Sequence, residues 1–400
     1  MLKVHSEPPK QAALANSGPA IFALGFRPFF SAAGVAAVIL IPVWILIWMG
    51  RLEIPHYYGS VGWHSHEMLF GYAAAIIAGF LLTAVRNWTG VNTPSGAPLA
   101  LLVLLWLAGR LLPLLSGYLP GWMLAAVDLA FLPAVALSIA PALWQGAQKI
   151  NRIFVPLLLV MALANLLVHL QALGVADSAV RGIDMMLYMV VFLVALIGGR
   201  VMPFFTQAVI PGFRASRKEW LETTTMGAFP VLILLQLFDA PLYLTGLTAL
   251  LLAAAQALRV AGWHHPQVWR MPILWVLYTG MFWMVIGLLM LALASFGLVG
   301  ANLAKHALGV GSIGVLTLGM MSRVALGHSG RPIEPVRSIG IAFILLNAAA
   351  AVRVFGPLIP LGNYTFWVHL SGGLWILCFL IFCRVYLPIL SSPRIDGKPG

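Results

Sequence analysis

The sequence has little charge for its length. Only 8% of its 400 residues are charged and 61% are hydrophobic, whereas about a quarter of the residues in a soluble globular domain are charged. These proportions exclude a soluble fold and indicate an integral membrane protein. Cysteine is also scarce, because the chain has two, Cys378 and Cys383, in one apolar stretch. A disulfide framework is therefore excluded, and we expect both to be core residues.

Long apolar stretches recur through the chain. Each has about the 17 to 25 residues that a helix needs to cross a bilayer. They are residues 31–50, 64–86, 97–115, 122–142, 152–174, 182–202, 222–239, 241–262, 272–294, 303–326, 338–355 and 365–386. We therefore predict an all-α, polytopic membrane protein with about 12 transmembrane helices. The count depends on residues Asp239 to Pro241, which we expect to separate helices seven and eight; without a break there, the chain would have one helix fewer.

A single integral membrane domain is predicted over residues 1–400. Residues 1–30 form a cytoplasmic amino-terminal segment that ends in an aromatic and cationic collar at the membrane interface. Residues 31–386 form the transmembrane bundle, and residues 387–400 form a cytoplasmic tail. Residues 1–20 contain no short apolar core followed by a small-residue cleavage site, so no removable signal peptide is predicted.

The basic residues predict the orientation of the bundle. If the chain crosses the membrane 12 times, 18 of its 23 Lys and Arg residues fall on the side of the amino terminus and 5 on the other. Short loops rich in Lys and Arg remain in the cytoplasm, so we expect both termini to be cytoplasmic. The net charge of +12 is thus explained by topology. The lipid bilayer is the expected partner, and no nucleic acid is.

Histidines gather at one predicted depth. His66, His169, His306 and His369 each lie 15 to 20 residues from an arginine at the cytoplasmic end of their own helix. Four helices would therefore carry histidine in the outer half of the bilayer. A single histidine inside a helix bundle is usually just hydrogen-bonded. Four at one level are more typical of a metal or cofactor site, because imidazole is the commonest metal ligand.

Helices two and ten carry related sequences. An offset of 240 residues superposes His66 on His306, Gly71 on Gly311 and Gly79 on Gly319. This pattern, with a weaker match at half the offset, favours three four-helix repeats of about 120 residues. Next to His66, His64 points about 200° away if both residues are helical. The two imidazoles then face different centres.

Four glycines follow His306 within one apolar run: Gly309, Gly311, Gly314 and Gly319. Small residues allow close packing of neighbouring helices, and they equally allow a flat cofactor to approach the backbone. His306 favours the cofactor. At the cytoplasmic ends of helices six and ten, Arg200 and Arg323 are candidate cofactor-binding residues. For Arg200 the ligand would be an anionic group such as a propionate, although reaching toward lipid headgroups explains it as well.

Two acids lie inside predicted helices, Asp128 in helix four and Asp184 in helix six. Ionisable residues within a membrane are costly and generally have a partner or a function. Either acid is therefore a candidate for a proton path.

Five stretches together resemble the NnrS family of bacterial inner-membrane proteins. They are LGFRPFF at 24–30, WHSHEMLFG at 63–71, AGFLLTAV and NWTG within 78–90, GGRVMPFFT at 198–206, and the whole of 306–332. The resemblance runs through the chain. It implies a protein that contains haem and copper and acts in the response to nitric oxide and nitrosative stress, often alongside denitrification. The motifs do not disclose a chemical activity, and they identify no electron donor.

The resemblance implies a site built from the histidines. The expected cofactor-binding residues are His64, His66, His306, Arg200 and Arg323, and the expected metal ligands are His64, His66, His169, His306 and His369. The expected cofactors are haem, of the b type, and copper. The expected ligand is nitric oxide or a nitrosylated metal species.

A more distant similarity links the chain to haem-copper oxidases, in which histidines of helices two and ten hold a low-spin haem. His66, or His64, and His306 would occupy those places. Helices six and seven carry no histidine, so the copper trio of the oxidases has no counterpart and nitric oxide reduction of that type is disfavoured. A twelve-helix secondary transporter for copper or a small solute is the alternative. Against it, residues 86–96 lack the acidic and repeated basic residues of the major facilitator signature.

Overall fold

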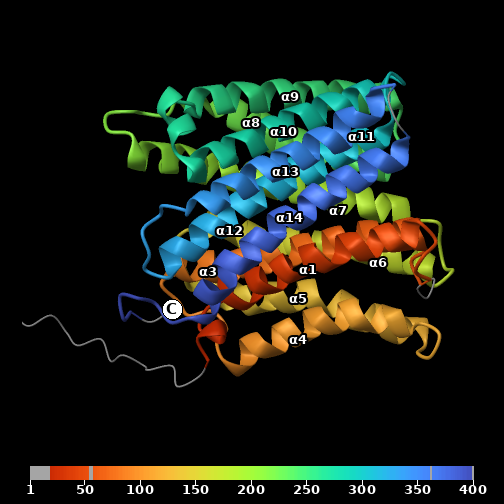
Figure 1. Cartoon of the computed structure of the whole chain (residues 1–400), viewed down its shortest axis with the longest axis horizontal. Coiled ribbons are helices and arrows are strands. Elements are labelled where there is room, and N and C mark those ends of the chain that lie inside the picture. Colours follow the sequence, from red (N-terminus) through yellow and green to blue (C-terminus); the bar gives the residue numbers. More distant parts are fainter. Residues whose placement is uncertain (1–18, 54–56, 361–362, 399–400) are drawn as a thin grey trace, which may run out of the picture.

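The computed structural model describes residues 19–53, 57–360 and 363–398. It is 81% helical, and the described residues contain no strand. Helices run along the long axis of the molecule from one end to the other (Figure 1). The predicted amino-terminal segment up to residue 18 lies outside the described residues.

Twelve helical spans are long and apolar enough to cross a membrane, which confirms the predicted fold class. Seven are single helices: α1 (Phe26–Trp48), α5 (Gly121–Gln145), α7 (Ala179–Val209), α8 (Glu219–Leu237), α9 (Leu242–Trp263), α10 (Pro272–Ser295) and α14 (Tyr364–Ser391), which is the twelfth span. Three spans add a short 3-10 turn to an α-helix: α4 (Ala97–Leu111) with η3 (Leu112–Leu115), η4 (Lys149–Ile153) with α6 (Phe154–Ala172), and α13 (Arg337–Phe355) with η7 (Gly356–Leu358).

Spans two and ten are each interrupted by a π-helical segment. Span two consists of α2 (Ser60–His66), η2 (Glu67–Ala73) and α3 (Ala74–Thr89). Span ten consists of α11 (Ala301–His306), η6 (Ala307–Gly314) and α12 (Val315–His328). Both π segments begin at the residue after the histidine that the 240-residue offset superposes. The two spans therefore share backbone geometry as well as sequence. π-helical turns are rare in proteins, and those that occur are often at functional sites.

The boundaries of the spans follow local sequence signals. Asp239 and Pro241 do separate two spans, because α8 ends at Leu237 and α9 begins at Leu242. Asp239 adopts a positive φ of 49° in this turn, a conformation that short polar side chains tolerate. The predicted collar at residues 25–30 forms the first turns of α1, where Phe26, Arg27 and Phe29 are buried.

The spans are arranged as three consecutive units of four. In each unit the second span packs against the first and the fourth. The units meet where span four packs on five, span eight on nine, and span twelve on one, so they close a ring. Spans two, six and ten are the most buried: 89%, 78% and 72% of their apolar 18-residue windows lie inside the structure. They occupy the same place in the three units. Span six also contacts the π segments of spans two and ten.

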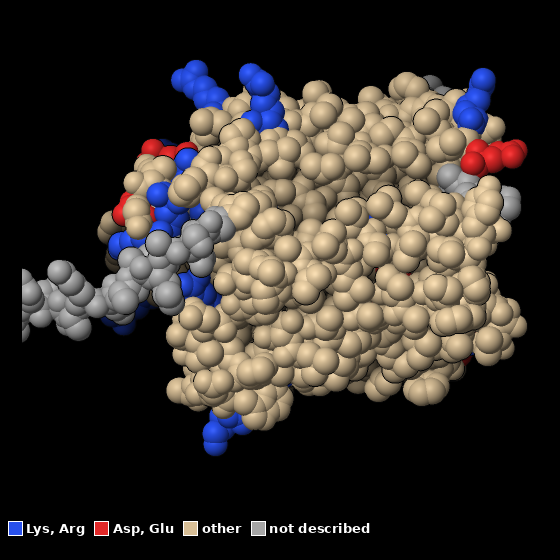
Figure 2. Space-filling view, turned by 90° about the horizontal axis from the view of Figure 1, so that it is seen from below, with Lys and Arg blue, Asp and Glu red and all other residues tan. Residues whose placement is uncertain are grey.

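The flank of the bundle is almost free of charged side chains in the face shown in Figure 2, where Lys and Arg lie at the two ends. Large apolar side chains on the spans, such as those of Leu101, Leu137 and Phe204, are exposed. An uncharged band of this kind suits a lipid bilayer. Of the two cysteines, Cys378 is buried and Cys383 half-buried, and both are free.

Candidate functional site

The predicted layer of histidines divides into two clusters of side chains. The first, which we call the Asp128 cluster, joins spans two to five and consists of Tyr57, Tyr58, His66, Glu67, Arg110, Asp128, Asn165 and His169. The second, the His64–His306 cluster, joins spans one, two, ten, eleven and twelve and consists of Trp44, Trp48, His64, His306, Arg353, Tyr364 and His369.

The Asp128 cluster is centred on one carboxylate oxygen. Asp128 Oδ2 lies 3.1 Å from His66 Nε2 and 3.0 Å from His169 Nε2. Asn165 donates its amide to the same oxygen at 2.8 Å, and its Oδ1 lies 3.0 Å from His66 Nε2. His66, Asp128 and His169 are almost fully buried, and their ligand atoms lie within 4.8 Å of one another. Two imidazoles and one carboxylate of this kind can hold a metal ion.

The other ring nitrogens of the two histidines are also engaged. His66 Nδ1 lies 3.3 Å from Glu67 Oε1, with Arg110 Nη1 at 3.4 Å. His169 Nδ1 lies 2.9 Å from the hydroxyl of Tyr57, which donates to the carbonyl of Gly121 at 3.2 Å. The ring of Tyr58 stacks on His66 with centroids 4.2 Å apart. Both imidazoles are thus fixed in orientation.

Arg110 balances the buried acids of the cluster. Its guanidinium donates to Glu67 Oε1 at 2.8 Å and to Asp128 Oδ1. Gly71 leaves room for the side chain of Arg110, because a Cβ at position 71 would lie only 3.3 Å from it. Two carboxylates and one guanidinium leave one net negative charge in a site sheltered from water.

Tyr57 and Tyr58 precede span two and cover the Asp128 cluster. Burial, with a contribution from the charge of Asp128, raises the pKa of Tyr57 to about 12. The same causes raise the pKa of Tyr58 well above its ordinary value. Both phenols therefore keep their protons at neutral pH.

The His64–His306 cluster is half-buried. The ring of His64 stacks on Trp44, with centroids 4.6 Å apart and planes inclined by 16°. His64 lies close enough to His306 to interact with it electrostatically, and Arg353 interacts with both imidazoles. Tyr364 accepts a hydrogen bond from Arg353 at 2.7 Å.

Several nitrogens in this cluster have no hydrogen-bond partner among the described residues. His306 Nδ1 lies 2.7 Å from the carbonyl of Asn302, so it carries the proton and the Nε2 lone pair is available. No hydrogen bond to either ring nitrogen of His64 is present in the described part of the chain. His369, whose ring meets Trp48 edge-on at 6.5 Å, has a buried Nε2 without a partner. Arg353 Nη1 is also buried and unpaired within the described chain.

The structure does not bring His66 and His306 together. Both nitrogens of His66 are engaged in the Asp128 cluster, and the charged groups that act on His306 are Arg353, His64 and Lys305. The helix-two histidine beside His306 is His64, because positions 64 and 66 face different sides of one helix. Spans two and ten are nevertheless neighbours: Tyr72 and Thr317 share a hydrogen bond of 2.8 Å.

The two predicted arginines lie elsewhere and have protein contacts. Arg200 donates to Asn151 Oδ1 at 2.7 Å, and the guanidinium of Arg323 lies 3.7 Å from the centroid of the Phe205 ring. Asp184 forms an ion pair with Lys305 at 2.5 Å, which gives this intramembrane acid a structural partner. His56, on the same predicted side as the clusters, lies outside the described residues.

Most of the glycines after His306 serve helix packing. A Cβ at Gly311 would lie 2.6 Å from the indole of Trp283, and one at Gly319 would lie 2.8 Å from Val276 and Leu277. A Cβ at Gly314 would likewise lie 3.0 Å from the indole of Trp375. Beside Gly309, by contrast, no atom lies within 4 Å of a built Cβ.

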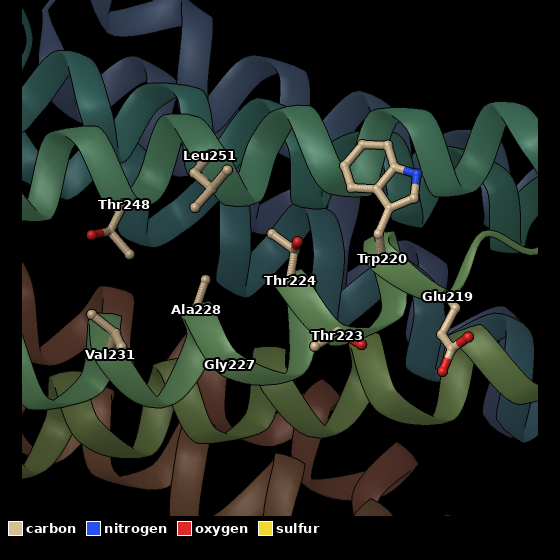
Figure 3. A pocket seen from close by; sticks show the side chains of 9 residues that line it. All are labelled: Glu219, Trp220, Thr223, Thr224, Gly227, Ala228, Val231, Thr248 and Leu251. Atoms are coloured by element: carbon tan, nitrogen blue, oxygen red, sulfur yellow. The ribbon is translucent and has the colours of Figure 1, made fainter.

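Two hollows lie away from the clusters. One is a groove between α8 and α9, lined by Thr223, Thr224, Gly227 and Thr248 among others, with Glu219 at its end (Figure 3). None of the predicted site residues lines it. The other is an apolar cavity of about 80 Å³ where spans two, six, nine and ten meet, lined by Ile77, Leu277 and Thr317 among others.

Sequence reasoning missed most of the Asp128 cluster. Arg110, Asn165, Tyr57, Tyr58 and Glu67 are not among the predicted site residues. A signal was present, because an acid at a position such as 128 needs a counter-charge within the membrane. Arg110, in the preceding span, is the basic residue that provides it.

Twelve apolar spans with two histidine clusters, of which the Asp128 cluster is buried, define a polytopic membrane protein that has a candidate metal site. The chain matches the family described as NnrS protein over residues 20–394, which is nearly its whole length. It therefore belongs to the NnrS family. Among curated proteins, none matches the chain significantly.

Proposed function

We propose that this protein binds haem and copper in the bacterial inner membrane and acts in the response to nitric oxide. Membership of the NnrS family supports this role. The observation that carries the haem assignment is the His64–His306 cluster. Two imidazoles lie near each other there, and each offers a ring nitrogen with no hydrogen-bond partner in the described chain.

The donor set of this cluster fits haem. His64 and His306 would supply the imidazole nitrogens, and the carbonyl of Asn302 holds His306 in the tautomer that leaves Nε2 free to bind iron. Arg353, with its unpaired buried nitrogen, would hold an anionic propionate. Trp44 and Trp48 supply flat apolar walls. Bound haem would supply an electron-transfer centre, and nitric oxide would reach its iron only by displacing one of the two imidazoles.

An apolar cavity of about 80 Å³ lies between the central spans, away from both histidine clusters. Nitric oxide is weakly polar and partitions into apolar regions, so this cavity would admit it. We also propose that both termini are cytoplasmic, because 18 of the 23 basic residues fall on their side. Both histidine clusters would then lie in the outer half of the membrane.

The test is the visible spectrum and the haem-to-protein ratio of purified protein in detergent. The wild type should show an intense Soret band. His306→Ala and His64→Ala should lose most of the haem, whereas His328→Ala should retain it. His328 is a matched control because it lies on span ten, where it contacts Asn87 and Phe26 at the far end.

Folding is checked by size-exclusion chromatography of each variant. Full haem occupancy in a monodisperse His306→Ala protein would contradict the assignment of the ligands. A well-folded wild type without a Soret band would contradict haem binding altogether and would favour the secondary transporter.

A further inference from the structure

The hydrogen bonds around His169 allow its Nε2 lone pair to face a carboxylate. The hydroxyl of Tyr57 has one proton, and the carbonyl of Gly121, 3.2 Å away, is a group that can only accept it. When Tyr57 donates there, it accepts from His169 Nδ1, which is 2.9 Å away. Neutral imidazole carries one N–H, so His169 Nε2 then presents a lone pair to Asp128 Oδ2 at 3.0 Å.

His66 can present its own Nε2 in the same way. Glu67 Oε1, at 3.3 Å from His66 Nδ1, is a carboxylate that accepts the ring proton in the tautomer that carries it on Nδ1. The Nε2 lone pair of His66 then faces Asp128 Oδ2 at 3.1 Å and Asn165 Oδ1 at 3.0 Å. In these tautomers two imidazole lone pairs converge with Asp128 Oδ2 and Asn165 Oδ1 from spans two, four and five. The N–H group among them is the Asn165 amide, which donates to Asp128 Oδ2 at 2.8 Å. A metal ion would satisfy this set of acceptors, as would a proton on a histidine.

The charge and spacing of these groups suit a metal ion. With both histidines neutral, Glu67 and Asp128 against Arg110 leave one negative charge to be balanced, and an unbalanced buried charge is costly. Two ligand atoms about 2.1 Å from a metal, at right angles, lie about 3.0 Å apart. Asp128 Oδ2 lies 3.0 and 3.1 Å from the two imidazole nitrogens, so small shifts would place all three around one ion.

We propose that the Asp128 cluster binds one divalent first-row transition-metal ion through His66 Nε2, His169 Nε2 and Asp128 Oδ2. Two imidazoles and one carboxylate suit such ions, with affinity rising from Mn²⁺ to Cu²⁺ and falling again at Zn²⁺. Glu67 and Tyr57 orient the ligands as acceptors of the outer N–H groups. This site shares no residue with the His64–His306 cluster and stands whether or not haem binds there.

The experiment uses full-length protein in detergent, stripped with EDTA and titrated with Zn²⁺, with bound metal measured by mass spectrometry. The wild type should take up about one ion per chain, besides any haem iron. His169→Ala and His66→Ala should bind at least about tenfold more weakly. His369→Ala, which removes an imidazole of the other cluster, is the matched control and should bind as the wild type does.

Tyr57→Phe tests the orientation of the ligand without removing one. It should weaken Zn²⁺ binding about 10- to 100-fold and leave the fold intact. In Cu²⁺-loaded wild type, electron paramagnetic resonance should report two imidazole nitrogens, and His169→Ala should report one. This readout decides the question even if a histidine variant binds weakly or folds poorly.

Two results would overturn the proposal. One is a wild type that takes up no stoichiometric Zn²⁺ or Cu²⁺, in which case the cluster holds protons alone. The other is His169→Ala protein that binds as tightly as the wild type. Haem content, measured in the same samples, separates this test from that of the proposed function: His169→Ala should keep its Soret band while losing the second metal.

Discussion

Arg110 is the residue on which the Asp128 cluster depends most for stability. Replacing it with Leu leaves Glu67 and Asp128 buried without their guanidinium partner. Removing one partner of a buried ion pair costs roughly 3 to 5 kcal/mol. We expect Arg110→Leu to unfold at a clearly lower temperature than the wild type, measured by thermal denaturation in detergent.

Arg181 provides the comparison for this prediction. It pairs with Asp239 at the surface, where the two side chains are 44% and 65% exposed. Exposed ion pairs contribute little to stability, so Arg181→Leu should change the unfolding temperature only slightly. Similar losses in the two variants would mean that burial does not set the strength of these pairs.

At the scale of helices, the π segments place the two key histidines. Each begins directly after His66 or His306. In both π segments a side chain donates a hydrogen bond to a backbone carbonyl. Trp106 donates to the carbonyl of Gly71 at 3.0 Å, and Thr317 donates to that of Ile313 at 2.7 Å. The two spans thus share a π-helical segment after the histidine, but different side chains bond to its carbonyl groups.

The glycines of the second π segment give a matched pair of substitutions. Gly311→Ala would place a methyl group 2.6 Å from the indole of Trp283, which a 3.0 Å hydrogen bond to Asn347 holds in place. We expect it to destabilise the protein by about 1 to 3 kcal/mol through overpacking. Gly309→Ala meets no atom within 4 Å and should be neutral or slightly stabilising.

Thermal unfolding of the two variants, prepared side by side, checks this prediction. If Gly311→Ala were as stable as Gly309→Ala, close packing between spans nine and ten would not explain the glycine at 311.

The sequence predicted the helices better than the clusters. Each span lies within a few residues of its predicted range, except that span six continues from residue 202 to Val209. Lipid imposes this regularity, because every backbone group of a membrane span must be satisfied internally. Neither the π segments nor the pairing of Asp128 with Arg110 has such a local signature. Both depend on which faces of spans two to five meet, and this is decided by tertiary packing.

At the scale of the molecule, the even number of spans puts the start of the first span and the end of the twelfth at one end of the ring. We expect a reporter fused after Gly212, between α7 and α8, to behave as cytoplasmic. A reporter fused after Gly117, between spans three and four, should behave as external. Alkaline phosphatase and fluorescent-protein fusions measure the two sides independently. The opposite pattern would reverse the orientation and place both histidine clusters toward the cytoplasm.

The closure of the ring by spans twelve and one has a consequence for biosynthesis. Arg27, at the start of α1, donates to the carbonyls of Leu390 and Ser392 at the end of the chain. α1 ends at Trp48 and α14 begins at Tyr364, so a ribosome adding 5 to 20 residues each second needs about 15 to 60 s to supply the missing partner. During that interval the first helix rests in the membrane with one side uncovered. A nascent chain that stops before α14 keeps that side exposed and is a natural target for membrane proteases.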